Sequence, residues 1–373
     1  MKLLHTSDWH LGRSLHRTDL RDAQAAFLDH LVETARAEQV DAVLVAGDIY
    51  DRAVPSVDAV ELCEGALVRL RETGARVILI SGNHDSARRL GFSSALIDEA
   101  GVHLRTRPSA LADPVLLEDE SGVVAVYGIP YLEPAAEGER SHEAVLGAAA
   151  ETIRVDAARR GAARTVVMAH GWVHGGQASD SERDISVGGA GSVPASLFAG
   201  FGYVALGHLH GQQTIAENMR YSGSPLPYSF SEATHKKGSW LVEIGADGAA
   251  RAERVPAPVY RRLSVLRGRL ADLLGSPAYE GNEGDFVAVT LTDTQRPDQA
   301  MDRLRTRFSH VLTLAFEPEG VVADGRRYGE KVAGKDDLAI ASEFVQHVRN
   351  TPPSEPERQL LAAAFEAARE EAR

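Results

Sequence analysis

Residues 77–85 read VILISGNHD, in which a run of four apolar residues is followed by Ser-Gly and then by Asn83, His84 and Asp85. Short apolar runs rich in Val and Ile are typical of strands that are buried on both faces of a sheet. The same pairing of an apolar run with residues of metal-ligand type occurs at four other places. These are residues 3–4 before Asp8 and His10, residues 43–46 before Asp48, residues 166–169 before His170, and residues 203–206 before His208 and His210. Five strands are therefore predicted, each ending beside potential metal ligands.

Two segments with helical spacing separate the first three of these strands, which indicates a layered α/β fold. Apolar residues recur at this spacing over residues 20–39 and 57–73, and the second segment ends at Gly74, a common helix terminator. Residues 123–127 and 240–244 are predicted to form further strands. Because the carboxyl ends of the strands of an α/β sheet share one edge, we expect the polar clusters to meet at a single rim. The glycine-rich segment 175–194 is expected to form a long loop near that rim.

These clusters have the composition of a dinuclear metal site. Asp8 and His10 are two residues apart, as are His208 and His210, so each pair points to one side of its strand end. Carboxylate and imidazole together suit Mn²⁺, Fe²⁺ or Zn²⁺ rather than the all-oxygen cage that binds calcium. Asp48 ends a neighbouring strand, where one carboxylate could bridge two ions. A lone histidine at a strand end is usually structural, but seven candidates at five strand ends favour a metal site: Asp8, His10, Asp48, Asn83, His170, His208 and His210.

His84 directly follows the candidate ligand Asn83, and two roles are open to it. A histidine beside a metal pair, held by a carboxylate such as Asp85, can stabilise or protonate an oxygen that leaves phosphorus. Alternatively, His84 is a further metal ligand or supports one from outside the coordination sphere. Its placement favours the catalytic role. Asp51 is expected to support a ligand or to cap a helix.

The composition is that of a globular protein with an acidic charge balance. Hydrophobic residues make up 44% and charged residues 25% of the 373 positions, and the net charge is −13. This acidity argues against a protein that coats nucleic acid by charge alone. It does not exclude a nuclease, because bound cations can supply the positive charge that a phosphate needs.

Neither membrane attachment nor a disulfide framework is expected. No segment approaches the roughly 20 apolar residues that span a bilayer, and the N-terminal residues become polar too early for a signal peptide. The single cysteine, Cys63, excludes an intramolecular disulfide. We therefore expect a cytoplasmic protein.

A change of pattern at Pro256-Ala257-Pro258 marks the end of the main domain. We expect this domain at 1–258, a small α+β domain at 259–318, a polar linker at 319–335, and two amphipathic helices at 336–373. The helical pair has too little core to stand alone, so its apolar stripe either docks on a partner or packs on its own chain.

Five segments resemble the signature blocks of the calcineurin-like metallophosphoesterases and occur in the same order. They are residues 8–10 (DWH), 47–51 (GDIYD), 82–85 (GNHD), 169–170 (AH) and 207–210 (GHLH). Within that superfamily the chain resembles the SbcD family, the nuclease subunits of the bacterial SbcCD complex. This finer resemblance rests on residues 6–12 (TSDWHLG), 179–183 (SDSER), 205–210 (ALGHLH) and 221–225 (YSGSP).

The resemblance implies a β-sandwich flanked by helices that binds two manganese ions. Asp8, His10 and His210 would hold one ion, and Asn83, His170 and His208 the other, with Asp48 bridging them and His84 acting in catalysis. The domain at 259–318 would orient DNA, and the terminal helices would bind the coiled coil of an SbcC-type ATPase. A homodimer within a heterotetramer is implied, with double-strand exonuclease and single-strand or hairpin endonuclease activity in DNA repair, recombination and replication.

Two other functions would use the same candidate site. A phosphoesterase for small nucleotides or phosphoproteins is disfavoured by the domain at 259–318, the terminal helices and the segment 179–183. A metal-bound scaffold for DNA ends, whose catalysis is dispensable, is disfavoured by the intact ligand set and by His84. The sequence therefore predicts a metal-dependent DNA phosphodiesterase.

Overall fold

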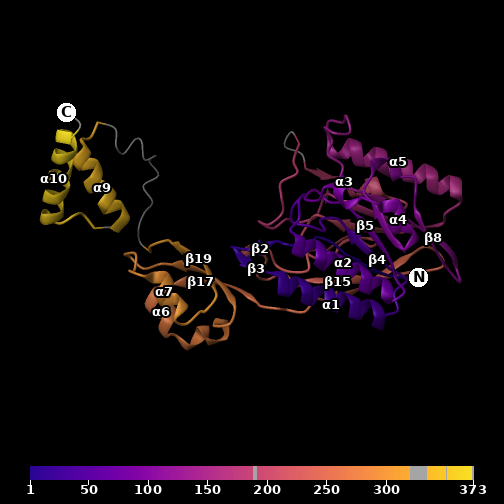
Figure 1. The fold of residues 1–373 in the computed structure, drawn as a ribbon, viewed down its shortest axis with the longest axis horizontal. Helices are drawn as coiled ribbons and strands as arrows, with labels where there is room; N and C mark the ends of the chain where they lie inside the picture. The colour runs from indigo at the N-terminus through magenta and orange to yellow at the C-terminus, as the bar shows by residue number, and fades with distance from the viewer. Residues whose placement is uncertain (188–190, 320–333, 350, 372–373) are drawn as a thin grey trace. The chain divides into compact units, whose positions relative to one another are not determined.

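The computed structural model describes residues 1–187, 191–319, 334–349 and 351–371, in two compact units, Met1–Tyr260 and Arg261–Arg373 (Figure 1). Most of the linker expected at 319–335 lies outside the described residues, as does part of the loop expected at 175–194. None of the helices in the described part of the chain is long and apolar enough to cross a membrane.

The first unit is built on two six-stranded sheets. The first has the order β16 (Ala250–Pro256), β15 (Gly238–Ile244), β1 (Lys2–Thr6), β4 (Ala42–Ala46), β5 (Arg76–Ile80) and β6 (Val102–Arg105). The second has the order β13 (Gln213–Ala216), β14 (Met219–Tyr221), β12 (Tyr203–Gly207), β9 (Arg164–His170), β8 (Gly122–Ile129) and β7 (Val115–Asp119). In the first sheet β1, β4, β5 and β6 run parallel, and in the second β8, β9, β12 and β14 do.

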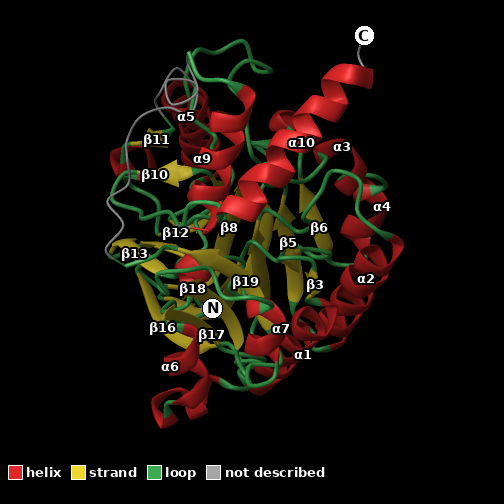
Figure 2. Ribbon diagram, turned by 90° about the vertical axis from the view of Figure 1, so that its left-hand side faces the viewer, coloured by secondary structure: helices red, strands yellow, loops and turns green. Residues whose placement is uncertain are grey.

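Helices cover the outer face of each sheet, which gives four layers (Figure 2). Helices α1 (Arg21–Ala37) and α2 (Val57–Glu72) pack on the first sheet, and α5 (His142–Arg160) packs on the second. Successive strand side chains point to opposite faces, so Val43 and Val45 of β4 meet the helices while Leu44 and Ala46 face the other sheet. Both faces are therefore buried, which explains the uninterrupted apolar runs. This arrangement confirms the predicted α/β class and the sandwich flanked by helices.

Helix α5 has no counterpart among the predicted elements. Its first turn is capped by Ser141, whose hydroxyl accepts a hydrogen bond from the backbone N–H of Ala144 at 3.2 Å, and it ends at Gly161 with φ +66°. Both are ordinary helix boundary signals. Helix α2 begins in the same way at Ser56, which accepts from the N–H of Ala59 at 3.3 Å.

Short elements complete the first unit. They are the strands β2 (Ser14–Leu15), β3 (Thr18–Asp19), β10 (Trp172–Val173) and β11 (Ser192–Val193), the helices α3 (Ala87–Leu90) and α4 (Ser94–Glu99), and the 3-10 turns Pro108–Ala110, Ala195–Phe198 and Phe230–Glu232.

The second unit has its own hydrophobic core. Its parallel sheet consists of β17 (Leu263–Gly268), β18 (Phe286–Leu291) and β19 (Val311–Phe316), and helices α6 (Leu270–Gly275) and α7 (Ala300–Arg305) alternate with these strands along the chain. Leu273, Val287 and Leu304 lie at the centre of this core. Helices α9 (Asp337–Arg349) and α10 (Glu355–Glu371) pack on each other and follow the undescribed residues. The DNA-orienting and partner-binding roles of these segments stay predictions.

Candidate metal centre

The loops that follow five parallel strands of the two facing sheets bring the seven candidate ligands together. Strand β1 leads to Asp8 and His10, β4 to Asp48, β5 to Asn83, β9 ends at His170, and β12 leads to His208 and His210. Six of these side chains are at most 3% exposed, and Asn83 is half-buried. Buried polar groups usually have hydrogen-bond partners, but among the described residues Nδ1 of His10 and Nδ2 of Asn83 have none.

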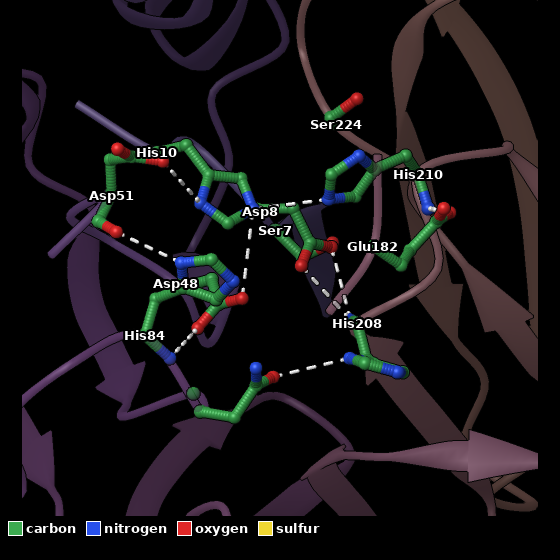
Figure 3. A network of polar contacts seen from close by, with 12 residues as sticks. Ser7, Asp8, His10, Asp48, Asp51, His84, Glu182, His208, His210 and Ser224 are labelled. Atoms are coloured by element: carbon green, nitrogen blue, oxygen red, sulfur yellow. Dashed lines mark hydrogen bonds and ion pairs between the residues drawn. The ribbon is translucent and has the colours of Figure 1, made fainter. Parts of the chain in front are cut away.

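One group of candidate ligands consists of Asp8, His10 and His210, whose ligand atoms lie within 4.8 Å of one another (Figure 3). The Nε2 atoms of His10 and His210 are 3.0 Å apart. Asp8 also accepts the backbone N–H of His208 at 3.0 Å, which fixes the loop after β12 against the loop after β1. These side chains therefore point into one common space.

A second group forms around the side-chain oxygen of Asn83. This Oδ1 atom lies 2.9 Å from Nε2 of His170 and 3.2 Å from Nδ1 of His208. Asp48 lies between the two groups, because its Oδ2 atom is 3.6 Å from Nε2 of His10 and 3.5 Å from Nε2 of His170. The carboxylate of Asp48 is thus placed to serve both.

The donor atoms of the second group fit a cation. The Nδ1 atom of His170 lies 2.9 Å from the carbonyl oxygen of Ala46, which can only accept, so Nδ1 carries the proton. When the ring is neutral, Nε2 therefore carries a lone pair. This lone pair faces the side-chain oxygen of Asn83 and the carboxylate of Asp48, so three electron-rich atoms point at one another. A cation between them would stabilise this arrangement. Burial lowers the pKa of His170, but the charge and hydrogen bonding of Asp48, the charge of Asp8 and the hydrogen bond to Ala46 together raise it to about 9. The site therefore attracts positive charge.

The backbone at these positions is held in conformations that non-glycine residues seldom adopt. Positive φ angles occur at Asp8 (52°), His10 (46°), Asp48 (50°) and His208 (105°), four of the nine such non-glycine residues in the described ranges. Each conformation of this kind costs about 1–3 kcal/mol and persists only where surrounding contacts enforce it. Such clustering is typical of functional sites, where side-chain direction matters more than local stability.

Gly82 has no side chain, and the carboxylate of Asp48 occupies the place where a Cβ atom would lie. Gly82→Ala is therefore expected to displace that carboxylate. A Cβ atom at position 82 would lie 2.1 Å from Oδ1 and 2.4 Å from the backbone nitrogen of Asp48. We expect the variant to bind less metal and to lose hydrolytic activity, as measured by elemental analysis and by cleavage of a model phosphodiester.

The matched control for Gly82→Ala is Gly65→Ala, on the exposed face of α2, where a Cβ atom would meet nothing within 4 Å. This control should keep its metal and gain about 1 kcal/mol of stability, because alanine favours helix more than glycine does. Wild-type metal content in Gly82→Ala would contradict the packing argument.

His84 lies beside the ligand groups and is oriented by Asp51. Its Nδ1 atom donates to the backbone carbonyl of Asp51 at 2.9 Å, and its backbone N–H donates to Oδ1 of Asp48 at 2.8 Å. The carboxylate of Asp51 lies 3.8 Å from Nδ1 of His10. Nε2 of His84 is therefore the ring nitrogen left for another partner.

The expectation that the carboxylate of Asp85 holds the ring of His84 is wrong. Its carboxylate oxygens accept three backbone N–H groups, from Ile49 at 3.1 Å, Tyr50 at 3.0 Å and Gly82 at 2.9 Å. Asp85 thus joins the loop after β4 to the loop after β5. The ring of His84 is held by a carbonyl group instead.

Four further residues support His210 and are absent from the predicted site. Ser181 contacts its ring, Glu182 accepts its backbone N–H at 2.7 Å, and Glu232 and Lys237 form a buried ion pair behind Ser181. Residues 179–183 belong to a segment that supports the SbcD resemblance, which was the available signal for Ser181 and Glu182. No sequence pattern indicates Glu232 or Lys237.

Two family models match the chain. Residues 1–212 match the family described as calcineurin-like phosphoesterase. Residues 259–349 match the SbcD C-terminal family, described as type 5 capsule protein repressor C-terminal domain. The combination confirms the resemblance to the SbcD family.

The solved structures to which the chain is similar include TT1561 of Thermus thermophilus, with 14% identity and a TM-score of 0.41. They also include a dimetal phosphatase from Danio rerio, with 14% identity and a TM-score of 0.38. Each comparison covers 68% of this chain and 98% of the other. The family match at residues 1–212 is the more informative finding, and because it spans more than half of the 373 residues, the chain belongs to the calcineurin-like phosphoesterase family of metal-dependent hydrolases.

Proposed function

We propose that this protein is a Mn²⁺-dependent DNA phosphodiesterase and the nuclease subunit of an SbcCD-type complex. The observation that carries the proposal is the placement of Asp48 between two groups of buried ligands. The match of residues 259–349 to the SbcD C-terminal family supports membership of an SbcCD-type complex, and the SbcD resemblance implies DNA as the substrate class. Imidazole, carboxylate and amide ligands in one site suit Mn²⁺, and also Fe²⁺ and Zn²⁺.

In this proposal each side chain has a defined part. Asp8, His10 and His210 would hold one divalent ion, Asn83, His170 and His208 would hold the other, and Asp48 would serve both. Two such ions would supply Lewis-acid activation of the phosphate and of the attacking water. Asp51 and Asp85 orient the residues that make these contacts.

His84 is proposed to assist departure of the 3′ oxygen of the cleaved strand. Its Nδ1 atom is engaged by the carbonyl of Asp51, so Nε2 is the atom that can exchange a proton with the substrate. The hydrogen bond from its backbone to Asp48 fixes the distance between the ring and the metal ligands. In this proposal the ring supplies acid–base chemistry beside the phosphate, and metal content tests the alternative that His84 joins His10 and Asp48 as a ligand.

The test is an assay of the purified full-length chain after its metal has been removed. Mn²⁺ should restore cleavage of a model phosphodiester and of end-labelled linear and hairpin DNA, and an SbcC-type ATPase with ATP should stimulate cutting of duplex ends. Cleavage of the model compound without any cutting of DNA would favour a phosphoesterase for small substrates. Tight binding of DNA ends without cleavage would favour a scaffold.

Removal of α9 and α10 is expected to separate catalysis from assembly. Truncation at about residue 330 should leave cleavage of the model phosphodiester intact, because every proposed ligand precedes residue 211. The helices expose apolar side chains, with Phe344 53% and Leu360 72% exposed. We therefore expect the truncated chain to lose stable co-purification with the ATPase and ATP-stimulated cutting of duplex ends.

A point variant and its control sharpen the truncation experiment. Phe344→Glu should weaken co-purification in the same direction, because it places a charge in the proposed interface. Val155→Glu, at a 61% exposed position of α5, should leave co-purification unchanged. Wild-type yield of the complex from the truncated chain would place the partner interface elsewhere.

A further inference from the structure

His210 is held differently from the histidines whose rings are fixed by the main chain. The Nδ1 atoms of His170 and His84 donate to backbone carbonyl groups, of Ala46 and Asp51. The Nδ1 atom of His210 instead contacts the hydroxyl of Ser181, a side chain 29 residues earlier in the sequence. The orientation of this ring therefore depends on replaceable side chains.

Ser181 lies between His210 and Glu232, and the chemistry of the Glu232 carboxylate determines where the protons of this chain lie. The hydroxyl of Ser181 lies 2.5 Å from Oε1 of Glu232, and an ionised carboxylate can only accept hydrogen bonds. Ser181 has one proton and gives it to Glu232, so its oxygen accepts from His210. Nδ1 of His210 must then carry the proton, which leaves the lone pair on Nε2, the atom that faces His10 at 3.0 Å.

Lys237 keeps Glu232 in the ionised state that this arrangement needs. Its ammonium group forms an ion pair with Oε2 of Glu232, and both side chains are almost fully buried. The same ammonium group donates to the backbone carbonyl of His210 at 2.8 Å and to the hydroxyl of Ser224 at 2.9 Å. The pair thus holds both the ring and the main chain of His210.

The buried ion pair of Glu232 and Lys237 is not explained by a gain in folding stability. The cost of removing two charges from water often equals or exceeds the attraction between them, and well-packed apolar residues are commonly as stable. The pair lies directly behind a candidate ligand. Outer partners of this kind fix the tautomer and direction of metal-binding histidines.

We propose that Glu232, locked by Lys237 and acting through Ser181, is a positioning residue that keeps His210 in the tautomer able to bind metal. The proposal rests on the metal-dependent function proposed above. It assigns to Glu232 and Lys237 the control of one ion position, the one that His210 shares with Asp8 and His10. The position formed by Asn83, His170 and His208 is not under this control.

Glu232→Gln tests the direction of the hydrogen bonds with little change of volume. Lys237 will attract the amide oxygen of the new side chain, which turns its NH₂ group toward Ser181. The hydroxyl of Ser181 must then donate to Nδ1 of His210, and the proton of the ring moves to Nε2, where it blocks a metal ion. Affinity at this position should fall by about 10–100-fold, the usual effect of losing an outer partner.

The experiment compares full-length metal-free proteins by calorimetric titration with Mn²⁺ and by the visible spectrum after Co²⁺ is added. Glu232→Gln should weaken one of two binding steps and alter the Co²⁺ spectrum. Ser181→Ala, which leaves the ion pair intact, should do the same, and Ser181→Thr, which keeps the hydroxyl, should restore both. Asp156→Asn is the control, because it neutralises another buried carboxylate, one that bonds to Tyr127 and to no candidate ligand.

The outcomes separate this inference from the proposed function. If the wild-type chain binds fewer than two ions, the proposed function fails. If the wild-type chain binds two and both Glu232→Gln and Ser181→Ala bind them with unchanged affinity and spectrum, the positioning role is overturned. Should Glu232→Gln not fold, as judged by circular dichroism, Ser181→Ala alone decides between these results.

Discussion

Replacement of Asp48 by Asn is expected to abolish phosphodiesterase activity and to lower the metal content of the protein. Burial alone would raise the pKa of Asp48, but the histidines around it, His170 foremost, hold that pKa well below its usual range. The carboxylate is therefore charged, and the amide would remove that charge from the point between both ligand groups. We expect a rate loss of about 10³-fold or more, because Lewis-acid assistance is worth several kcal/mol.

Elemental analysis and turnover of a model phosphodiester check this expectation together. Asp156→Asn serves as the control, since it also neutralises a buried carboxylate, one that bonds to Arg159 and Arg160 on α5. The control should keep its metal and its turnover. Near-normal turnover of Asp48→Asn with two ions bound would show that this carboxylate bridges nothing.

His84→Gln is expected to leave two ions per chain and to slow the chemical step by about 10²–10⁴-fold, the usual effect of losing an acid–base group. The Gln side chain has a similar reach and can still donate to the carbonyl of Asp51, so the loop should keep its shape. What is lost is the ring nitrogen that exchanges a proton.

Metal content decides between the two roles that are open to His84. If an ion is missing from His84→Gln, the ring is a ligand and its catalytic assignment is wrong. Single-turnover rates should fall with KM little changed, because the residue is proposed to act on the leaving oxygen rather than in binding. His347→Gln, at an exposed position of α9, is the control and should match the wild-type chain.

The strand ends could be predicted because the signal for them is local. A short Val-rich apolar run such as residues 43–46 favours a buried strand, and a residue that follows within two positions then lies at the carboxyl end of that strand. The position of Asp48 at the rim therefore follows from its immediate neighbours. The same reasoning places His170 and His208.

Helix α5 and the support of His210 could not be predicted in this way. The sequence of α5 is rich in alanine and has charged residues on several sides, so no clear apolar stripe marks it. The contacts of Ser181 with His210 and with Glu232 join positions 29 and 51 residues apart. Such contacts depend on how the loops pack after the sheets have formed, and no local spacing rule encodes them.

The pairing of β1 with β15 has a consequence for how the chain is synthesised. Lys2 pairs with Glu243, so one edge of the first strand finds its partner only after about 240 further residues have been made. At typical synthesis rates of about 5–20 residues per second, that delay is on the order of 10–50 s.

During this interval β1 can pair only with β4, and its other edge presents unpaired N–H and C=O groups to neighbouring chains. The nascent polypeptide therefore carries an open β edge until β15 has been made. Strand β1 is thus made about 240 residues before the strand that completes its pairing, and its open edge is a site of possible aggregation in the translating chain that the folded protein no longer presents.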